Sequence, residues 1–280
     1  MTIDDLTPWK DRAGRFSAIR AAAFAALAAP ALWLIALLAL GWIGPEPEKA
    51  ATHFTGEWTL YILLAGLAVS PLRAHLGYGR LIGLRRMIGL FAFGFVAAHF
   101  GLYVLYMNGN VLKVATEIVS RVYLIVGFVA LLGLAALAAT SFDRAIRRMG
   151  GNWRRLHALV YPLTALGVLH YFMQSKLDVS QPALLAGIFC GLVLLRLRAL
   201  RAAPPALALL LAAALAGVSA AGLEAAWHAG MTGAPWRRIL LANLDFSFEI
   251  RPPWIAAAIM AAPILLLPRY RQMLRSATQS

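Results

Sequence analysis

The sequence predicts an all-α, polytopic transmembrane helical bundle of about eight spans, with both termini in the cytoplasm. Of its 280 residues, 61% are hydrophobic and only 14% are charged, and the mean hydropathy is +0.72. This composition excludes a disordered chain and is atypical of a soluble globule. The hydrophobic residues gather in long runs, and a helix needs roughly 17–25 apolar residues to cross a bilayer.

Eight runs have about this length and composition, and we take them as the predicted spans. They cover residues 21–43, 57–72, 87–106, 122–140, 157–173, 183–199, 204–222 and 254–268. The first is predicted to be a retained helix instead of a signal peptide, because it is long and follows an acidic leader. The second and the last are short, so interfacial residues at their ends must help them to cross.

The net charge of +14 is explained by topology better than by nucleic-acid binding. With the N-terminus in the cytoplasm, 19 Lys and Arg residues fall on the cytoplasmic side and 7 on the opposite side. This asymmetry follows the positive-inside rule and orients the spans. Binding of the cytoplasmic basic residues to anionic lipid or to an acidic partner stays open.

Several classes of site are excluded by the motifs. The single cysteine, Cys190, allows no disulfide framework, and the absence of a C-x-x-C-H sequence excludes a covalently attached haem. No phosphate-binding loop or dinucleotide-binding glycine motif is present. The one long connection, residues 223–253, contains a weakly alternating segment at Asn243–Ile250, which is typical of a strand or an interfacial piece.

Three histidines lie within predicted spans, where an ionisable side chain is rare unless it is functional. His99 lies in the third span, and His157 and His170 lie in the fifth. The two spans run in the same direction, so His99 is predicted to lie level with His170 near the outer face. Two imidazoles at one depth on neighbouring helices would form a bis-histidine site for a b-type haem.

His157 fits this arrangement less simply. It precedes His170 by thirteen residues, so on an ideal helix the two side chains point about 140° apart. Either Pro162 kinks the helix between them, or His157 lies at a looser helix end. Arg85 begins the third span at the level of His157, where its guanidinium could pair with a haem propionate or another anionic cofactor.

Histidines in membrane helices can also form structural hydrogen bonds between helices or serve in a proton relay, and both roles stay open here. His53 is expected in the first outer loop as a solvated or capping residue, although its place near the outer site keeps it a candidate. His75 is expected in a basic cytoplasmic loop and His228 in the long outer loop. Neither of the last two is assigned a role.

At these residues the chain resembles a known family. Residues 25–200 are similar to the ferric-reductase-like transmembrane domain, and more closely to the haem-binding membrane subunit of the bacterial periplasmic methionine sulfoxide reductase system, the MsrQ or YedZ family. The matching pieces are His53-Phe-Thr-Gly, Arg85-Arg-Met-Ile-Gly-Leu, the His99 helix, Arg121-Val-Tyr-Leu, and Trp153-Arg-Arg-Leu-His157 followed by His170-Tyr. The wider superfamily has a histidine where this chain has Arg85.

The resemblance implies an electron-transfer subunit with no substrate chemistry of its own. It implies haem b ligated by His99 and His170, with His157 as a ligand to a second haem or an alternative partner, and a bound FMN that no residue can be assigned to. The implied partner is a periplasmic molybdenum-containing catalytic subunit that reduces methionine sulfoxide in oxidised proteins. The implied electron donor is the quinone pool or a cytosolic flavin reductase, and the implied location is the inner membrane.

Three parts of the chain are predicted: a cytoplasmic segment at 1–20, a six-helix haem-binding domain at 21–200, and an extension at 201–280 with two more spans. The outer loop of the extension is expected either to seat the partner through Trp227, Trp236 and Arg237 or to be a plain hairpin. Two other functions stay open. A ferric-chelate or NADPH-oxidase-like reductase would ordinarily need a further flavin and nicotinamide module, and a transporter or proton relay would contain no absorbing cofactor.

Overall fold

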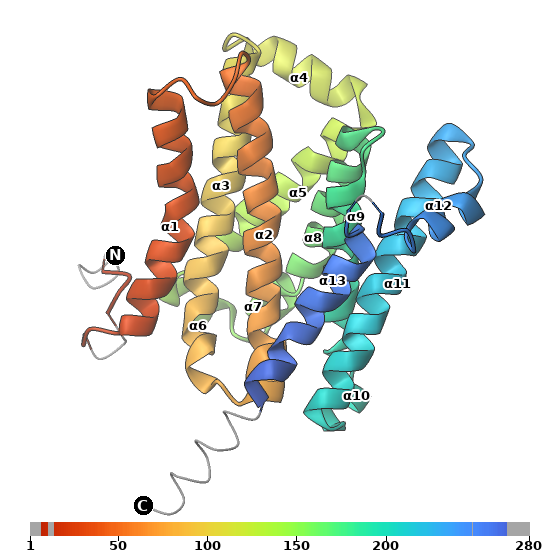
Figure 1. Cartoon of the computed structure of the whole chain (residues 1–280). Helices are drawn as coiled ribbons and strands as arrows, with labels where there is room; N and C mark the ends of the chain where they lie inside the picture. The colour runs from red at the N-terminus through yellow and green to blue at the C-terminus, as the bar shows by residue number, and fades with distance from the viewer. Residues whose placement is uncertain (1–6, 11–13, 248, 268–280) are drawn as a thin grey trace, which may run out of the picture. The chain divides into compact units, whose positions relative to one another are not determined.

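The computed structural model describes residues 7–10, 14–247 and 249–267, and within these ranges the chain is helical with no β-strand (Figure 1). In this described part of the chain, six helical segments are long and apolar enough to cross a membrane, and two shorter apolar helices accompany them. The prediction of an all-α polytopic bundle is therefore confirmed. The short members of the set are Ser180–Leu194 and Pro252–Leu266, whereas the second segment is longer than predicted.

The helices divide between two compact units. Unit 1 comprises residues 1–66 and 83–164, and unit 2 comprises residues 67–82 and 165–280. Unit 1 contains α1 (Ala18–Ala39), the first part of α2 (Pro47–Leu76), the end of η2 (Gly79–Leu84), α3 (Arg85–Tyr106), α4 (Val111–Ser120), α5 (Val122–Ala139), α6 (Asp143–Met149), α7 (Gly151–His157) and the start of α8 (Val160–Ser175). Within this unit α3 packs against α1 and α5, and α4 against α5.

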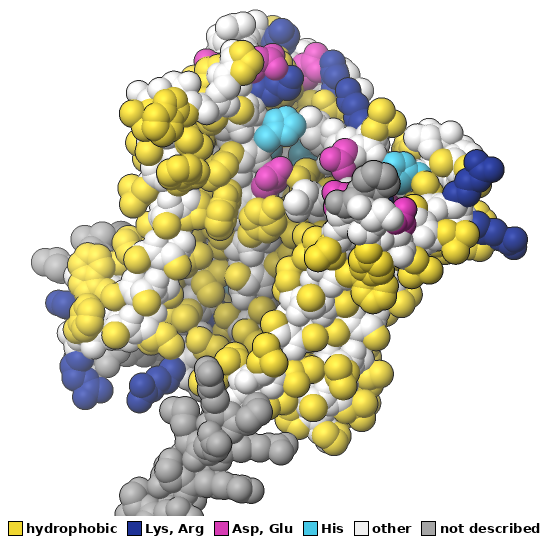
Figure 2. Space-filling model, in the orientation of Figure 1, with side chains coloured by type: hydrophobic (Ala, Val, Ile, Leu, Met, Phe, Trp, Pro, Cys, Tyr) yellow, Lys and Arg dark blue, Asp and Glu magenta, His cyan; other side chains and the backbone are white. Residues whose placement is uncertain are grey.

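Unit 2 contains the remainder of α2 and α8 together with the C-terminal helices. These are α9 (Ser180–Leu194), α10 (Arg198–Ala202), α11 (Pro205–Thr232), α12 (Trp236–Ala242), α13 (Pro252–Ala261) and η3 (Ala262–Leu266). On the face shown in Figure 2, apolar side chains cover the lengths of the helices, while Lys and Arg lie towards their ends. Large apolar side chains such as Trp33 and Leu211 are exposed, as expected of helices that face lipid.

Helix α2 begins ten residues earlier than the predicted span of 57–72. Its first turns are polar, so a hydropathy window does not include them, yet Pro47 stands at the start and Glu48 lies in the first turn. Both features favour a helix N-terminus, because proline lacks the N–H that would be unpaired there and an acidic side chain interacts well with the helix dipole. His53 and His75 therefore lie in α2, and the prediction that both are loop residues is wrong.

The predicted fifth span is two helices. Helix α7 ends at His157, Ala158 and Leu159 form a turn, and α8 begins at Val160. Pro162 lies in the first turn of α8, where its missing N–H is tolerated. The structure therefore supports a helix end at His157 and not a kink at Pro162, and the angle calculated for one continuous helix does not apply.

The C-terminal helices of unit 2 pack through small residues. A Cβ atom added to Gly187 of α9 would collide with the backbone oxygen of Ala216 in α11, and one added to Gly191 would lie 2.9 Å from that of Ala212. Such close approach of backbones is typical of membrane helix pairs with small residues at the interface. It leaves α9, α11 and α13 side by side (Figure 1).

The segment at 223–253 is more ordered than predicted. Helix α11 continues to Thr232 and carries His228, α12 follows, and the described residues of 243–250 form no strand. Glu224 is only 3% exposed and receives a 3.1 Å hydrogen bond from Arg251 at the start of α13. The prediction of a long outer loop containing His228 is wrong, because the apolar face of α11 stays covered beyond residue 222.

One polar contact within unit 2 compensates for a proline. Pro71 lies inside α2, so the carbonyl oxygen of Leu67 has no N–H at the i+4 position to bond with. Arg196, just after α9, donates from Nη2 to this oxygen at 2.6 Å. The carbonyl that the proline leaves unpaired is thereby satisfied by a side chain from outside α2, as membrane proteins require.

Candidate functional site

His99 is held by the first part of α2, within unit 1. His99 is in α3, and its Nδ1 lies 2.8 Å from the backbone oxygen of Thr52 in α2. A carbonyl oxygen can only accept a hydrogen bond, so Nδ1 is the donor. A neutral imidazole that donates from Nδ1 carries its lone pair on Nε2, which is the form that coordinates a metal.

Gly56 lies beside this imidazole. A Cβ atom at position 56 would be 2.9 Å from Nδ1 of His99 and 3.0 Å from Cε1. Residues 52 and 56 are four apart in a helix and so lie one above the other on one face. The ring of His99 therefore occupies the space that a side chain at position 56 would fill. The sequence indicates Gly56 only as part of a motif, because the pairing of α2 with α3 that creates this contact is a tertiary feature.

His157 has a different environment in the same unit. Its ring stacks on that of Trp153 with centroids 4.0 Å apart, and its Nε2 lies 3.2 Å from Oγ1 of Thr140. The Thr140 hydroxyl also lies within hydrogen-bond distance of the carbonyl oxygens of Ala136 and Leu137, and while it donates to them it can accept from Nε2 of His157. In either direction this bond occupies Nε2, so coordination through that nitrogen would require His157 to give it up.

Trp153 forms a second hydrogen bond between α7 and Thr140. Its Nε1 donates to the backbone oxygen of Thr140 at 2.9 Å, so the indole and the imidazole both attach α7 to the end of α5. Arg85, the first residue of α3, is exposed, and its charge acts electrostatically on the His157 ring. The neighbouring Arg86 forms an exposed ion pair with Asp143 of α6 at 3.0 Å, and such surface pairs contribute little to stability.

The remaining histidines are placed in different surroundings. His170 lies half-buried in α8, and its pairing with His99 stays a prediction. His53 is exposed in α2, and His228 is half-buried in α11. His75 is only 6% exposed at the end of α2, where its ring lies near the backbone of Leu195. Among the described residues, no group of three or more His, Cys, Asp or Glu side chains could hold a metal ion.

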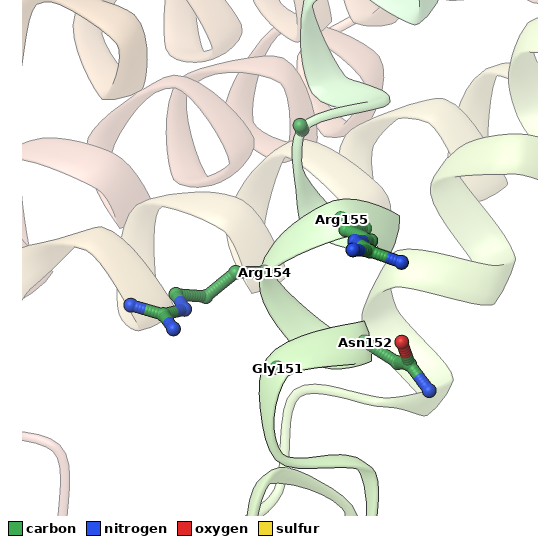
Figure 3. Close-up of a pocket in the computed structure, with 5 residues that line it drawn as sticks. Gly151, Asn152, Arg154 and Arg155 are labelled. Carbon is green, nitrogen blue, oxygen red and sulfur yellow. The ribbon is translucent and has the colours of Figure 1, made fainter.

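A hollow of about 440 Å³ lies beside α7 and is lined by Gly151, Asn152, Arg154, Arg155 and Ala158. Figure 3 shows the two arginine side chains pointing away from each other. A convergent set of polar groups is what distinguishes a binding site from a surface depression. This hollow has no such set, and we assign it no ligand.

Two tryptophans of the C-terminal extension differ in their contacts. Trp227 packs on Phe172 with ring centroids 5.3 Å apart, and its Nε1 donates to the backbone oxygen of Lys176 at 3.2 Å. Trp227 therefore joins α11 to the end of α8. Trp236, by contrast, is 52% exposed, and the guanidinium of Arg237 lies 5.3 Å from its ring centroid. Of the residues expected to seat a partner, Trp236 and Arg237 are the accessible ones.

Taken together, the fold and these contacts define a multi-pass α-helical membrane protein with imidazoles held between its helices. The sequence model of the family described as "Ferric reductase like transmembrane component" matches residues 55–168, a range that contains Gly56, Arg85, His99 and His157. No solved structure matches the chain.

The protein-methionine-sulfoxide reductase heme-binding subunit MsrQ of Rhodospirillum rubrum is 42% identical over 190 residues, which cover 67% of this chain and 89% of that protein. The subunit of the same name from Xanthomonas campestris pv. campestris is 43% identical over 152 residues, or 54% of this chain and 70% of the relative. The chain belongs to the MsrQ family. The first alignment leaves about a third of this chain outside it, so the chain is longer than that relative.

Proposed function

We propose that this chain is the haem-binding membrane subunit of a bacterial protein-methionine-sulfoxide reductase, and that it passes electrons through the inner membrane without substrate chemistry of its own. The names of its relatives support the haem and the sulfoxide reductase system. The periplasmic molybdenum-containing catalytic subunit and the donor, either quinone or a cytosolic flavin reductase, are parts of the proposal that come from the resemblance. The implied FMN stays a prediction with no assigned residue.

The observation that carries the proposal is the hydrogen bond from Nδ1 of His99 to the backbone oxygen of Thr52. Histidines that ligate metals almost always donate their other ring N–H to a carbonyl or carboxylate, which fixes the ring and makes the ligating nitrogen more basic. His99 already has this arrangement. A haem iron takes four ligands from the porphyrin, so one or two imidazoles are sufficient to complete its coordination.

A bound haem b would supply one-electron chemistry in a region of low dielectric constant. The residues of this chain would contribute three things to it. His99 would bind the iron through Nε2, with His170 as the proposed second ligand. The Thr52 carbonyl would hold the Nδ1 proton of His99 in place, and Arg85 would neutralise an anionic substituent such as a propionate. His157 stays a candidate for a second haem.

The test is a reduced-minus-oxidised optical spectrum of the protein purified from cells that are well supplied with haem precursor. We expect haem bands in the unchanged protein and their loss in His99→Ala and in His170→Ala. His228→Ala is the matched control, because His228 lies in α11 and is assigned no role in the site, and it should leave the bands unchanged. A colourless unchanged protein would contradict the proposal and favour a transporter or proton relay.

Two further variants test the finer assignments. Arg85→Ala should alter the haem spectrum or the rate of haem reduction, and no change in either would remove Arg85 from the site.

Trp236→Ala should slow electron transfer to the catalytic subunit while leaving the haem bands intact. An unaltered transfer rate would favour the plain-hairpin interpretation of the extension.

A further inference from the structure

Position 56 of α2 is occupied by glycine, although most residues with a side chain would stabilise the helix more. It lies well inside α2, which is 30 residues long, and glycine is among the least favourable residues in a helix interior. Its position therefore needs a local explanation. The atoms nearest to an added Cβ are all in the imidazole of His99, at 2.9, 3.0 and 3.8 Å.

The direction of the missing side chain matters as much as its volume. In an α-helix the Cα–Cβ bond tilts towards the N-terminus, so a methyl group on residue 56 would project towards the turn that contains Thr52. That turn provides the carbonyl oxygen that receives the Nδ1 hydrogen of His99. A methyl group would thus enter the space between the imidazole and the helix that carries its hydrogen-bond acceptor.

Gly66, the other glycine of α2 in unit 1, provides a contrast. A Cβ there would lie 3.1 Å from the Cγ2 methyl of Ile88, and an aliphatic methyl can shift by rotation without losing a polar partner. The ring of His99 cannot shift in this way, because movement away from position 56 lengthens the 2.8 Å bond to Thr52. The same substitution at the two glycines should therefore have different consequences.

From this geometry we propose that Gly56 is a positioning residue for His99. By carrying no side chain, it sets how closely the imidazole approaches α2, keeps the proton on Nδ1, and thereby fixes the direction of the Nε2 lone pair. The inference rests on the proposed function for its consequence in haem binding, but the position of the proton is a property of the chain alone.

The experiment compares Gly56→Ala with Gly66→Ala in two measurements. Nitrogen-15 NMR of selectively labelled histidine in haem-free protein reports which ring nitrogen of His99 carries the proton, with His99→Gln used to assign the signal. Haem retention during dilution, followed by the optical spectrum, reports on the ligand in loaded protein. We expect Gly56→Ala to abolish the pure Nδ1–H form and to weaken haem retention by about 10–100-fold, as for other substitutions around a metal ligand.

Gly66→Ala should leave both measurements unchanged. The proposal is overturned if Gly56→Ala and Gly66→Ala behave alike, or if the unchanged protein has its His99 proton on Nε2. The second outcome needs no variant, so it decides the matter even if Gly56→Ala fails to accumulate. A protein that binds no haem but shows the expected proton shift would overturn the proposed function and leave the role of Gly56 supported.

Discussion

Thr52 and Leu67 of α2 each receive a hydrogen bond on the backbone oxygen from a side chain outside that helix, and they do so for different reasons. In unit 1, the oxygen of Thr52 accepts from Nδ1 of His99 at 2.8 Å. In unit 2, the oxygen of Leu67 accepts from Nη2 of Arg196 at 2.6 Å. The difference lies in what each oxygen would bond to if the donor were removed.

The backbone oxygen of Leu67 depends on Arg196 as its hydrogen-bond donor. Pro71 supplies no N–H, so without Arg196 the carbonyl would be unpaired in an apolar setting, which is costly. Thr52 does not depend on His99, because its oxygen has the regular helical partner at residue 56 and also accepts from Oγ1 of Thr55 at 3.0 Å. The bond to Leu67 therefore serves the backbone of α2, whereas the bond to Thr52 serves the imidazole.

The largest effect on stability is expected at Arg196. Arg196→Ala leaves the Leu67 oxygen unsatisfied and should lower the free energy of unfolding by about 1–3 kcal/mol. Thermal unfolding in detergent micelles measures this change. Arg198→Ala is the matched control, since Arg198 is an exposed arginine of α10, and it should have little effect. Equal losses in both variants would mean that the carbonyl of Leu67 does not need Arg196.

An intermediate effect on stability is expected when Pro71 is replaced, because Pro71 is the reason why the Leu67 oxygen needs Arg196. Pro71→Ala restores an N–H that can bond to the Leu67 oxygen, so Arg196→Ala should cost less in that background than in the unchanged protein. A double-mutant cycle measured by the same unfolding transition gives the coupling, which we expect to be about 1 kcal/mol. Strict additivity of the two substitutions would contradict the role assigned to this contact.

The smallest effect is expected at His99 in haem-free protein. His99→Leu removes the donor to Thr52 but leaves that oxygen with its helical partner, so the unfolding free energy should change by less than about 1 kcal/mol. The haem bands should nevertheless disappear from the loaded protein. If His99→Leu destabilised the haem-free protein as strongly as Arg196→Ala, the bond to Thr52 would be structural and the comparison would fail.

Hydropathy predicted the apolar helices well because lipid imposes a simple requirement of length and composition. It failed where polar residues continue a helix beyond the apolar region, as at residues 47–56 of α2. Local signals were available there in Pro47 and Glu48. Helix α4 was not predicted because it is a separate helix of ten residues, too short to cross a membrane, although Asn110 accepts a hydrogen bond from the backbone N–H of Lys113 as an N-cap.

The histidines were recognisable as candidates because ionisable residues are rare in spans, but their chemical states were not. The proton position of His99 depends on Thr52, which is 47 residues away in the sequence, and that of His157 depends on Thr140. Such contacts follow from how the helices pair, and the spacing of histidines along a span contains no information about them. Gly56 was visible in the sequence only as one letter of a motif.

Ala158 and Leu159 join α7 to α8, and this joint affects how the side chains of the two helices are oriented relative to each other. Within one α-helix every residue has a fixed azimuth relative to every other, about 100° per residue. The short joint between α7 and α8 ends that correlation, so the stacking of Trp153 on His157 does not dictate which way α8 turns. A residue inserted at the joint can be absorbed there, whereas one inserted within α3 would rotate all later side chains by more than a quarter of a circle.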